Sequence, residues 1–353
     1  MRTALQKATG FVLVVAFAAF VALAALFAFA TLETPYSAAA RWNPYSPAVA
    51  ANQELRGRVV ILDAGHGAET TNRYADYDEQ ATMLALARKI RPLLEARGAT
   101  VHMTRPAESD VPLPVRTATI NKWALEAVSD ARHRELSERR AAGENTSAIQ
   151  RDILEIDRLL KVARSVIDDH ETNAPVYLNV PYDDTYAREI HPDWRKIFEY
   201  EDDPEIRERF LVISLHSNAT PRPIDTSRRG ADAFYISNDL ERNASYYTNY
   251  SYEEQSAWFA ELILDRIDAV GIEKQRARGF FYHILREHNV PCVLVENGFH
   301  TNDGDRAKLL DDAFLDRLAR VYADAVAVYF AAAGSLPESG PEKYGDVFAR
   351  TAT

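Results

Sequence analysis

The stretch VVILDAGHG, residues 59–67, decides how this 353-residue sequence is interpreted. Its first part, Val59–Leu62, is a short apolar run, which is typical of a strand buried on both faces. Its second part, Asp63–Gly67, consists of small and polar residues, so the strand is expected to end in a tight loop that carries His66. The stretch therefore predicts a buried strand with a polar side chain at its carboxyl end.

The residues after this loop predict a helix and a second strand. Apolar side chains recur at helical spacing between Glu79 and Arg97, with Asp78 available as the N-cap and Gly98 as the C-terminal stop. The run Thr100–Thr104 follows as a strand. Because a strand, a helix and a strand are joined by short connections, we expect a parallel sheet covered by helices.

The same alternation returns in the second half of the chain. Strands are predicted at residues 209–215, 231–236 and 291–295, and helices at 252–270 and 314–330. We therefore predict an α/β domain over residues 58–332, with a mostly parallel twisted sheet and helices on both faces. Beyond it, residues 333–353 are rich in Gly, Ser, Pro and Glu and are expected to form a loose tail.

An inserted helical hairpin is predicted at about residues 122–208. A seam with spacings of three and four residues indicates a long helix that packs on a neighbouring helix. Its members are Ile149, Ile153, Ile156, Leu160, Ala163 and Ile167. The partner helix is expected from Trp123 to about Arg140, with the turn at residues 143–145. The polar stretch that follows contains Pro175, Pro181 and Pro192 and is predicted to be irregular.

The N-terminus carries a membrane-directed segment. Residues 8–32 hold no charge and are almost wholly apolar, after a basic start at Arg2 and Lys7. Residues 1–32 are thus expected to be an uncleaved signal anchor, with a cleaved signal peptide as the alternative. Either interpretation places the remainder in the periplasm or cell envelope. Residues 33–57, rich in Pro, Ser, Ala and Asn, are predicted to be a linker.

Composition excludes several classes of protein. The chain has 41 Lys and Arg against 52 Asp and Glu, a net charge of −11, which disfavours a nucleic-acid binder. Its single cysteine, Cys292, excludes an internal disulfide framework and a cysteine-rich zinc site. Cys292 lies in an apolar strand and is expected to be a buried small hydrophobe.

Three of the predicted strands lead to polar residues that a buried strand does not need. They are His66, His216 and Glu296, and Glu79 opens the helix after the His66 loop. Because ligands gather beyond the carboxyl ends of parallel strands, we expect these four side chains to converge at one edge of the sheet.

Two imidazoles and two carboxylates match the composition of a catalytic zinc site, in which one carboxylate binds the metal and the other acts as a base. Such a site takes three protein ligands and leaves a position for water, whose proton a second carboxylate can accept. We assign His66, Glu79 and His216 as ligands of one Zn²⁺ and Glu296 as the base. Three nearby acids could replace Glu79, namely Glu69, Asp76 and Asp78. Gly65 and Gly67 are expected to let the backbone turn sharply around His66.

These blocks together resemble a known family, the zinc-dependent N-acetylmuramoyl-L-alanine amidases of the third amidase type. The resemblance covers about residues 58–330 except for the insertion. It rests on residues 59–67, Glu79, Thr104-Arg105, Leu113, Arg116 with Asn121, residues 213–218, Gly230, residues 294–299 and Thr301-Asn302. Ala64 and Ala68 depart from the family pattern but remove no ligand.

The resemblance implies hydrolysis of the amide between N-acetylmuramic acid and L-alanine in peptidoglycan. It places zinc on His66, Glu79 and His216 and the catalytic carboxylate on Glu296. Two other functions would use the same group of residues. The protein could be a non-catalytic peptidoglycan-binding or scaffold protein, or a zinc carboxypeptidase that acts on peptide termini. For the inserted hairpin, we expect the docking of an activator or division protein, with an active-site cover or a stabilising decoration as alternatives.

Overall fold

The computed structural model describes residues 53–67, 70–179, 189–241 and 246–333. The predicted membrane segment, most of the linker and the tail beyond residue 333 lie outside these ranges. Along the ranges that are described, no helix combines the length and the apolar character needed to cross a bilayer.

A six-stranded sheet forms the centre of the described structure, in the order β4-β1-β5-β8-β6-β7. The four strands β4, β1, β5 and β8 are parallel, whereas β6 runs antiparallel to β8 and β7 runs parallel to β6. The bounds are β1 Val59–Ala64, β4 Thr100–Met103, β5 Phe210–Asn218, β6 Ala231–Tyr235, β7 Lys274–Gly279 and β8 Cys292–Phe299. The prediction of a mostly parallel sheet is confirmed, but β7 was not predicted.

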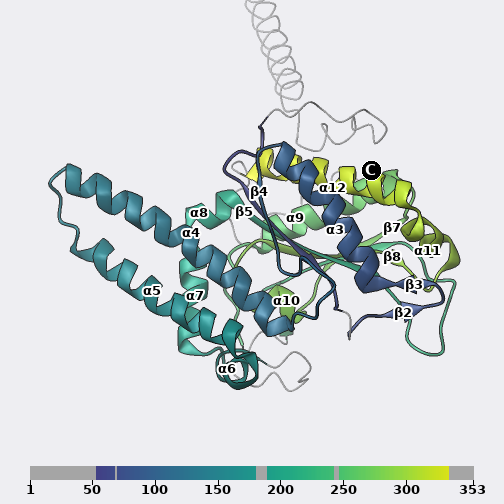
Figure 1. Ribbon diagram of the computed structural model, residues 1–353, viewed down its shortest axis with the longest axis horizontal. Coiled ribbons are helices and arrows are strands. Elements are labelled where there is room, and N and C mark those ends of the chain that lie inside the picture. The colour runs from purple at the N-terminus through teal and green to yellow at the C-terminus, as the bar shows by residue number, and fades with distance from the viewer. Residues whose placement is uncertain (1–52, 68–69, 180–188, 242–245, 334–353) are drawn as a thin grey trace, which may run out of the picture. The chain divides into compact units, whose positions relative to one another are not determined.

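Helices cover both faces of the sheet (Figure 1). One face packs against α3 (Glu79–Ala96), α9 (Glu253–Ala269) and α12 (Asp312–Ala333). The other face packs against α10 (His283–Arg286) and α4 (Leu113–Ala141). The short helix α11 (Asp303–Leu310) follows β8, and the two-stranded ribbon of β2 (Arg73–Tyr74) and β3 (Tyr77–Asp78) precedes α3.

The predicted hairpin is present. It consists of α4 and α5 (Ser147–Asp168), which lie side by side and project beyond the sheet in Figure 1. Most of the predicted seam of α5 is buried, and Ile167 is half-buried. However, α4 begins at Leu113, ten residues before the predicted start at Trp123. Its first turn contains Pro114, which the start of a helix tolerates because those N–H groups have no partner within the helix.

The prediction of irregular structure after the hairpin was wrong over the described residues. Three short helices occupy this stretch, namely α6 (His170–Tyr177), α7 (Pro192–Glu201) and α8 (Pro204–Arg209). Both α7 and α8 begin at a proline, with the side chains of His191 and Asp203 as N-caps. These prolines therefore start helices, because the fixed φ of proline suits the first helical position.

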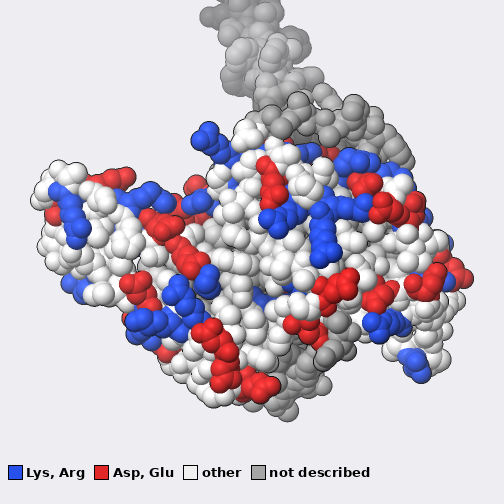
Figure 2. Space-filling model, in the orientation of Figure 1, with Lys and Arg blue, Asp and Glu red and all other residues white. Residues whose placement is uncertain are grey.

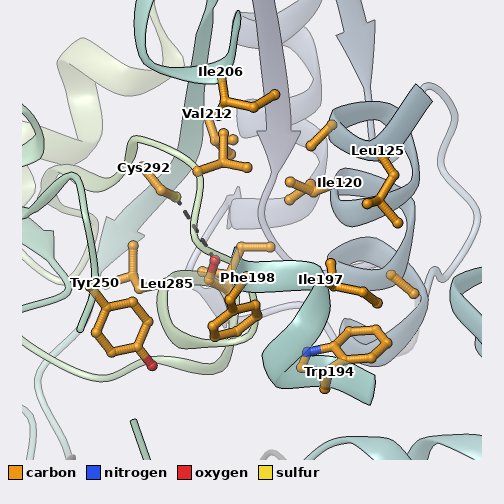
Figure 3. Close-up of a cluster of buried hydrophobic side chains, with 14 of the residues drawn as sticks. Ile120, Leu125, Trp194, Ile197, Phe198, Ile206, Val212, Tyr250, Leu285 and Cys292 are labelled. Carbon is orange, nitrogen blue, oxygen red and sulfur yellow. Dashed lines mark hydrogen bonds between the residues drawn. The ribbon is translucent and has the colours of Figure 1, made fainter. Parts of the chain in front are cut away.

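The hydrophobic core joins these helices to the sheet (Figure 3). In Figure 3, Ile120 and Leu125 of α4 and Trp194, Ile197 and Phe198 of α7 lie around Val212 and Cys292 of the sheet. Each of the seven is at most 1% exposed. Cys292 is the buried hydrophobe that the sequence predicts, and its thiol donates weakly to the Ile284 carbonyl oxygen at 3.8 Å. The first part of the hairpin is thus continuous with the domain core.

The surface of the hairpin carries both signs of charge. Figure 2 shows Lys and Arg interspersed with Asp and Glu over this region. Many of these charges are paired along or between the two helices, as in Arg139 with Glu135 and Arg164 with Glu126. Such exposed pairs contribute little to stability, so this is a solvated surface.

Candidate metal centre

His66 lies on the loop directly after β1, in a left-handed backbone conformation with φ of 59°. Its Nδ1 lies 2.7 Å from the carbonyl oxygen of Thr70. Because a carbonyl can only accept, Nδ1 carries the proton, and in the neutral ring Nε2 presents a lone pair. That Nε2 atom is 3.2 Å from Oε2 of Glu79. Burial lowers the pKa of His66, but the contact with the Glu79 carboxylate outweighs burial and raises the pKa above its ordinary value.

Two buried arginines hold the backbone of this loop. Arg105 donates from Nε to the Ala64 carbonyl and from Nη2 to the Gly65 carbonyl, both at 3.0 Å. Arg116 donates from Nη1 to Ala64 at 2.8 Å and from Nη2 to the carbonyl of His66. A left-handed conformation costs about 1–2 kcal/mol for a residue other than glycine. The four hydrogen bonds offset that strain and fix the direction of the imidazole.

Glu79 is the first residue of α3 and is 1% exposed. Asp78 caps the helix by accepting from the N–H of Ala81, so the start of α3 is fixed. Oε1 of Glu79 accepts from the backbone N–H of Ser217 at 2.9 Å and lies 3.1 Å from Nδ1 of His216. Burial raises the pKa of Glu79, but the two histidines hold it well below its usual range. The carboxylate is therefore ionised although it is buried.

The other oxygen of Glu79 gives a test of metal binding. Oε2 is buried and has no hydrogen-bond partner within the described residues, yet it faces the lone pair of His66 Nε2 at 3.2 Å. Two acceptors at that distance require a positive charge between them, either a proton or a metal cation. Ligand atoms of His66, Glu79 and His216 all lie within 4.8 Å of one another. Bonds of about 2.0–2.1 Å in tetrahedral geometry separate ligand atoms by about 3.3 Å. The three side chains therefore fit one small cation.

Gly65 makes room for the third of these side chains. His216 lies near the carboxyl end of β5, and its ring packs over the backbone of Gly65. A Cβ at Gly65 would lie 2.4 Å from Cε1 of His216, well inside van der Waals contact. The expectation that Gly65 and Gly67 provide the sharp turn was wrong, because the left-handed residue is His66 itself. At Gly67 an added Cβ would also clash, lying 1.7 Å from Oδ1 of Asp110.

Glu296 lies on β8 beside His216, its register partner on β5. On the other side its register partner is Asp232 of β6. Oε2 of Glu296 is buried without a hydrogen-bond partner among the described residues. Burial raises the pKa of Glu296 to about 8, with further contributions from the carboxylates of Glu79 and Asp232, while His216 acts in the opposite direction. Glu296 is thus a buried carboxyl group whose pKa lies well above its ordinary value.

The nearby acids that could have replaced Glu79 are engaged elsewhere or outside the described residues. Asp76 pairs with Arg306 at 3.2 Å, and Asp78 caps α3 and pairs with Arg73 at 2.7 Å. Glu69 lies outside the described residues. The structure therefore brings Glu79 to the two histidines.

Sequence reasoning did not find the support around this cluster. Tyr77 donates to Oγ of Ser217 at 2.8 Å, and Ser217 is hydrogen-bonded to Nδ1 of His300 at 3.0 Å. His300 in turn stacks on Tyr77, with ring centroids 4.9 Å apart. His300 therefore supports the cluster through this stacking and through its hydrogen bond to Ser217. The one signal in the sequence was that Ser217 directly follows His216.

Comparison with known proteins decides the family. Residues 60–129 and 142–328 match the family described as N-acetylmuramoyl-L-alanine amidase. The chain belongs to this amidase family. It is 26% identical to the endolysin of Bacillus phage SPP1 over 185 residues. This aligned region covers 52% of this chain and 61% of the endolysin. It is 43% identical to the N-acetylmuramoyl-L-alanine amidase CwlM of Bacillus licheniformis over 49 residues, and this shorter region covers 14% of this chain and 19% of CwlM.

The chain therefore spans less than two thirds of the length of these two relatives of the amidase family. Among solved structures, the N-acetylmuramyl-L-alanine amidase Ami1 of Mycobacterium smegmatis matches with 15% identity and a TM-score of 0.47. That match covers 79% of this chain and 99% of Ami1.

Proposed function

We propose that this protein is a zinc-dependent N-acetylmuramoyl-L-alanine amidase that cleaves the amide between N-acetylmuramic acid and L-alanine in peptidoglycan. Membership of the amidase family supports the reaction class. The observation that carries the proposal is the buried Glu79 oxygen that faces the lone pair of His66, with His216 beside it.

His66 Nε2, Glu79 and His216 would hold one Zn²⁺. The set of two imidazoles and one carboxylate is a donor set typical of catalytic zinc, and the hydrogen bond from His66 Nδ1 to Thr70 fixes the tautomer that a ligand needs. When bound, zinc supplies a Lewis acid for the scissile carbonyl and lowers the pKa of water.

Glu296 would move the proton in this reaction. Its Oε2 atom has no partner among the described residues and is therefore available to accept a proton from the attacking water. The same oxygen would then return the proton to the departing L-alanine nitrogen. Burial, which already raises the pKa of Glu296 to about 8, suits this exchange, because an effective acid and base has a pKa near the operating pH.

The proposal extends to the location of the protein. Residues 1–32 would anchor it in the inner membrane or direct its export, so that the domain acts on the cell wall from the periplasm or envelope. The α4–α5 hairpin would dock an activator or division protein, since it projects beyond the sheet that carries the site (Figure 1).

The decisive experiment is product analysis of purified sacculi treated with the full chain. An amidase releases stem peptides with a free L-alanine N-terminus and leaves glycan strands with an intact lactyl group, and a chelator abolishes both products. A zinc carboxypeptidase would instead release single C-terminal amino acids. A scaffold protein would bind sacculi and release nothing, and either of these results would overturn the proposal.

A further inference from the structure

An aromatic ledge lies on the sheet face beside Glu296. We use this name for the rings of Phe234, Phe280 and Tyr282. The ring centroids of Phe280 and Tyr282 are 4.4 Å apart, and those of Phe234 and Tyr282 are 5.4 Å apart. Tyr282 is 37% exposed although it is packed against two rings. Phe234 is only 2% exposed and supports the other two rings, so the surface that the ledge offers to a ligand comes from Tyr282 and the half-buried Phe280.

The register of the sheet places this ledge next to the proposed catalytic residue. Asp232 pairs with Glu296, and Phe234 pairs with Leu294 on the same antiparallel strands. Because side chains alternate along a strand, Phe234 and Glu296 project from the same face. The pKa of Tyr282 is raised to about 12, first by burial and next by Glu296, while Arg278 opposes the rise. The phenol therefore lies within the field of both side chains.

Arg278 completes the surface from the edge strand β7. It is the register partner of Phe234, and its Cζ lies 4.9 Å from the centroid of that ring. The side chain is exposed, and no carboxylate among the described residues forms an ion pair with it. Arg229, by contrast, lies near the same edge of the sheet but is engaged in an ion pair with Glu273 at 2.8 Å. Arg278 is thus a positive charge that is held in place by a ring and available to an anion.

We propose that Arg278 binds a carboxylate of the stem peptide and so determines which substrates this site prefers. The proposal rests on the amidase function proposed above. Two strand spacings of about 4.8 Å and two residues of about 3.4 Å put the backbones of Arg278 and Glu296 roughly 12 Å apart. An extended peptide covers about 3.3–3.6 Å per residue. A carboxylate one to three residues from the scissile amide can therefore reach the guanidinium, while the peptide lies along the ledge.

The chemistry favours a carboxylate over an amide at this position. A guanidinium can donate two parallel hydrogen bonds to a carboxylate, and these charge-assisted bonds are roughly twice as strong as neutral ones. A carboxamide carries no charge and offers one acceptor oxygen. We expect the exposed arginine to discriminate between the two by about tenfold in KM.

Two soluble muramyl peptides test this, differing only in a free carboxylate or a carboxamide on the residue after L-alanine. The variants are Arg278→Gln, which removes the charge, and Arg278→Lys, which keeps it without the fork. The control is Arg320→Gln, a half-exposed arginine on α12 at the opposite face of the sheet. Steady-state cleavage gives KM and kcat, and calorimetry in a Glu296→Gln background gives the affinity of each peptide without turnover.

The full chain and Arg320→Gln should prefer the carboxylate peptide by about tenfold in KM and in affinity. Arg278→Gln should remove that preference with kcat unchanged, and Arg278→Lys should retain part of it. Equal KM values for the two peptides in the full chain, or an equal loss of kcat on both in Arg278→Gln, would overturn the subsite while the amidase function stands. Arg278-dependent preference in calorimetry without any cleavage would uphold the subsite and refute the amidase function.

Discussion

Replacing Gly65 with alanine should release a proposed ligand from the metal centre without disturbing the fold. The added Cβ would lie 2.4 Å from Cε1 of His216, whereas ordinary contacts begin at about 3.4 Å, so the ring must move by about 1 Å. Zinc sites tolerate about 0.2 Å in ligand distance. Since Gly65 does not have a positive φ, the backbone accepts alanine and the clash is the main cost. We expect zinc affinity to fall at least a hundredfold, with a cost of about 1–3 kcal/mol in stability.

The assay is competition for zinc against a chromophoric chelator, with circular dichroism and urea unfolding on the same samples. Gly304→Ala is the matched control, because its added Cβ would meet only the Asn302 side chain at 3.3 Å, far along the chain in α11. A Gly65→Ala protein that binds zinc as tightly as the parent would refute the packing of His216 on Gly65 as the basis of the site.

Two further predictions concern stability. Burial raises the pKa of Glu201 to about 8 although Asn289 N–H donates to it, so the folded protein keeps a proton that the unfolded chain releases above about pH 4.5. Stability due to this group therefore falls as pH rises from about 4.5 to 8, by about 5 kcal/mol at most, and Glu201→Gln should remove that loss. Urea unfolding at pH 5 and pH 8 tests this, and a difference between variant and parent that does not grow with pH contradicts it. On α5, Ile156→Ala should cost about 2–5 kcal/mol, because Ile156 belongs to the main core, whereas Ile153→Ala at the separate cluster near the hairpin turn should cost less. If both variants lowered the urea midpoint equally, the hairpin would not be divided into a part that belongs to the main core and a separate cluster near the turn.

Much of the fold could be predicted because apolar runs and helical spacing are local signals. The runs at β1, β5 and β8 are buried on both faces, so their sequences are continuously apolar. The edge strand β7 was missed because Lys274–Gly279 has a largely polar sequence, as edge strands often have. The antiparallel direction of β6 depends on long-range pairing with β8, which no local pattern in Ala231–Tyr235 reveals.

For the candidate site, the sequence predicts the four functional side chains but not the residues that hold them in place. His66, His216 and Glu296 follow from strand ends, and Glu79 from the start of a helix, because the topology brings those points to one edge. The support of the His66 loop by Arg105 was not predictable, since its partners are carbonyl groups about 40 residues earlier in the chain. Long-range contacts of this kind depend on the finished fold.

The central claim is that one zinc held by two histidines and a glutamate works together with Glu296. The most direct measurement compares zinc per chain and amidase rate in the parent and in Glu296→Gln, using the same samples of the full chain. We predict one zinc per chain in both proteins and a rate at least a hundredfold lower in the variant. A parent protein that binds no zinc, or a Glu296→Gln protein that cleaves at the parent rate, would contradict the account.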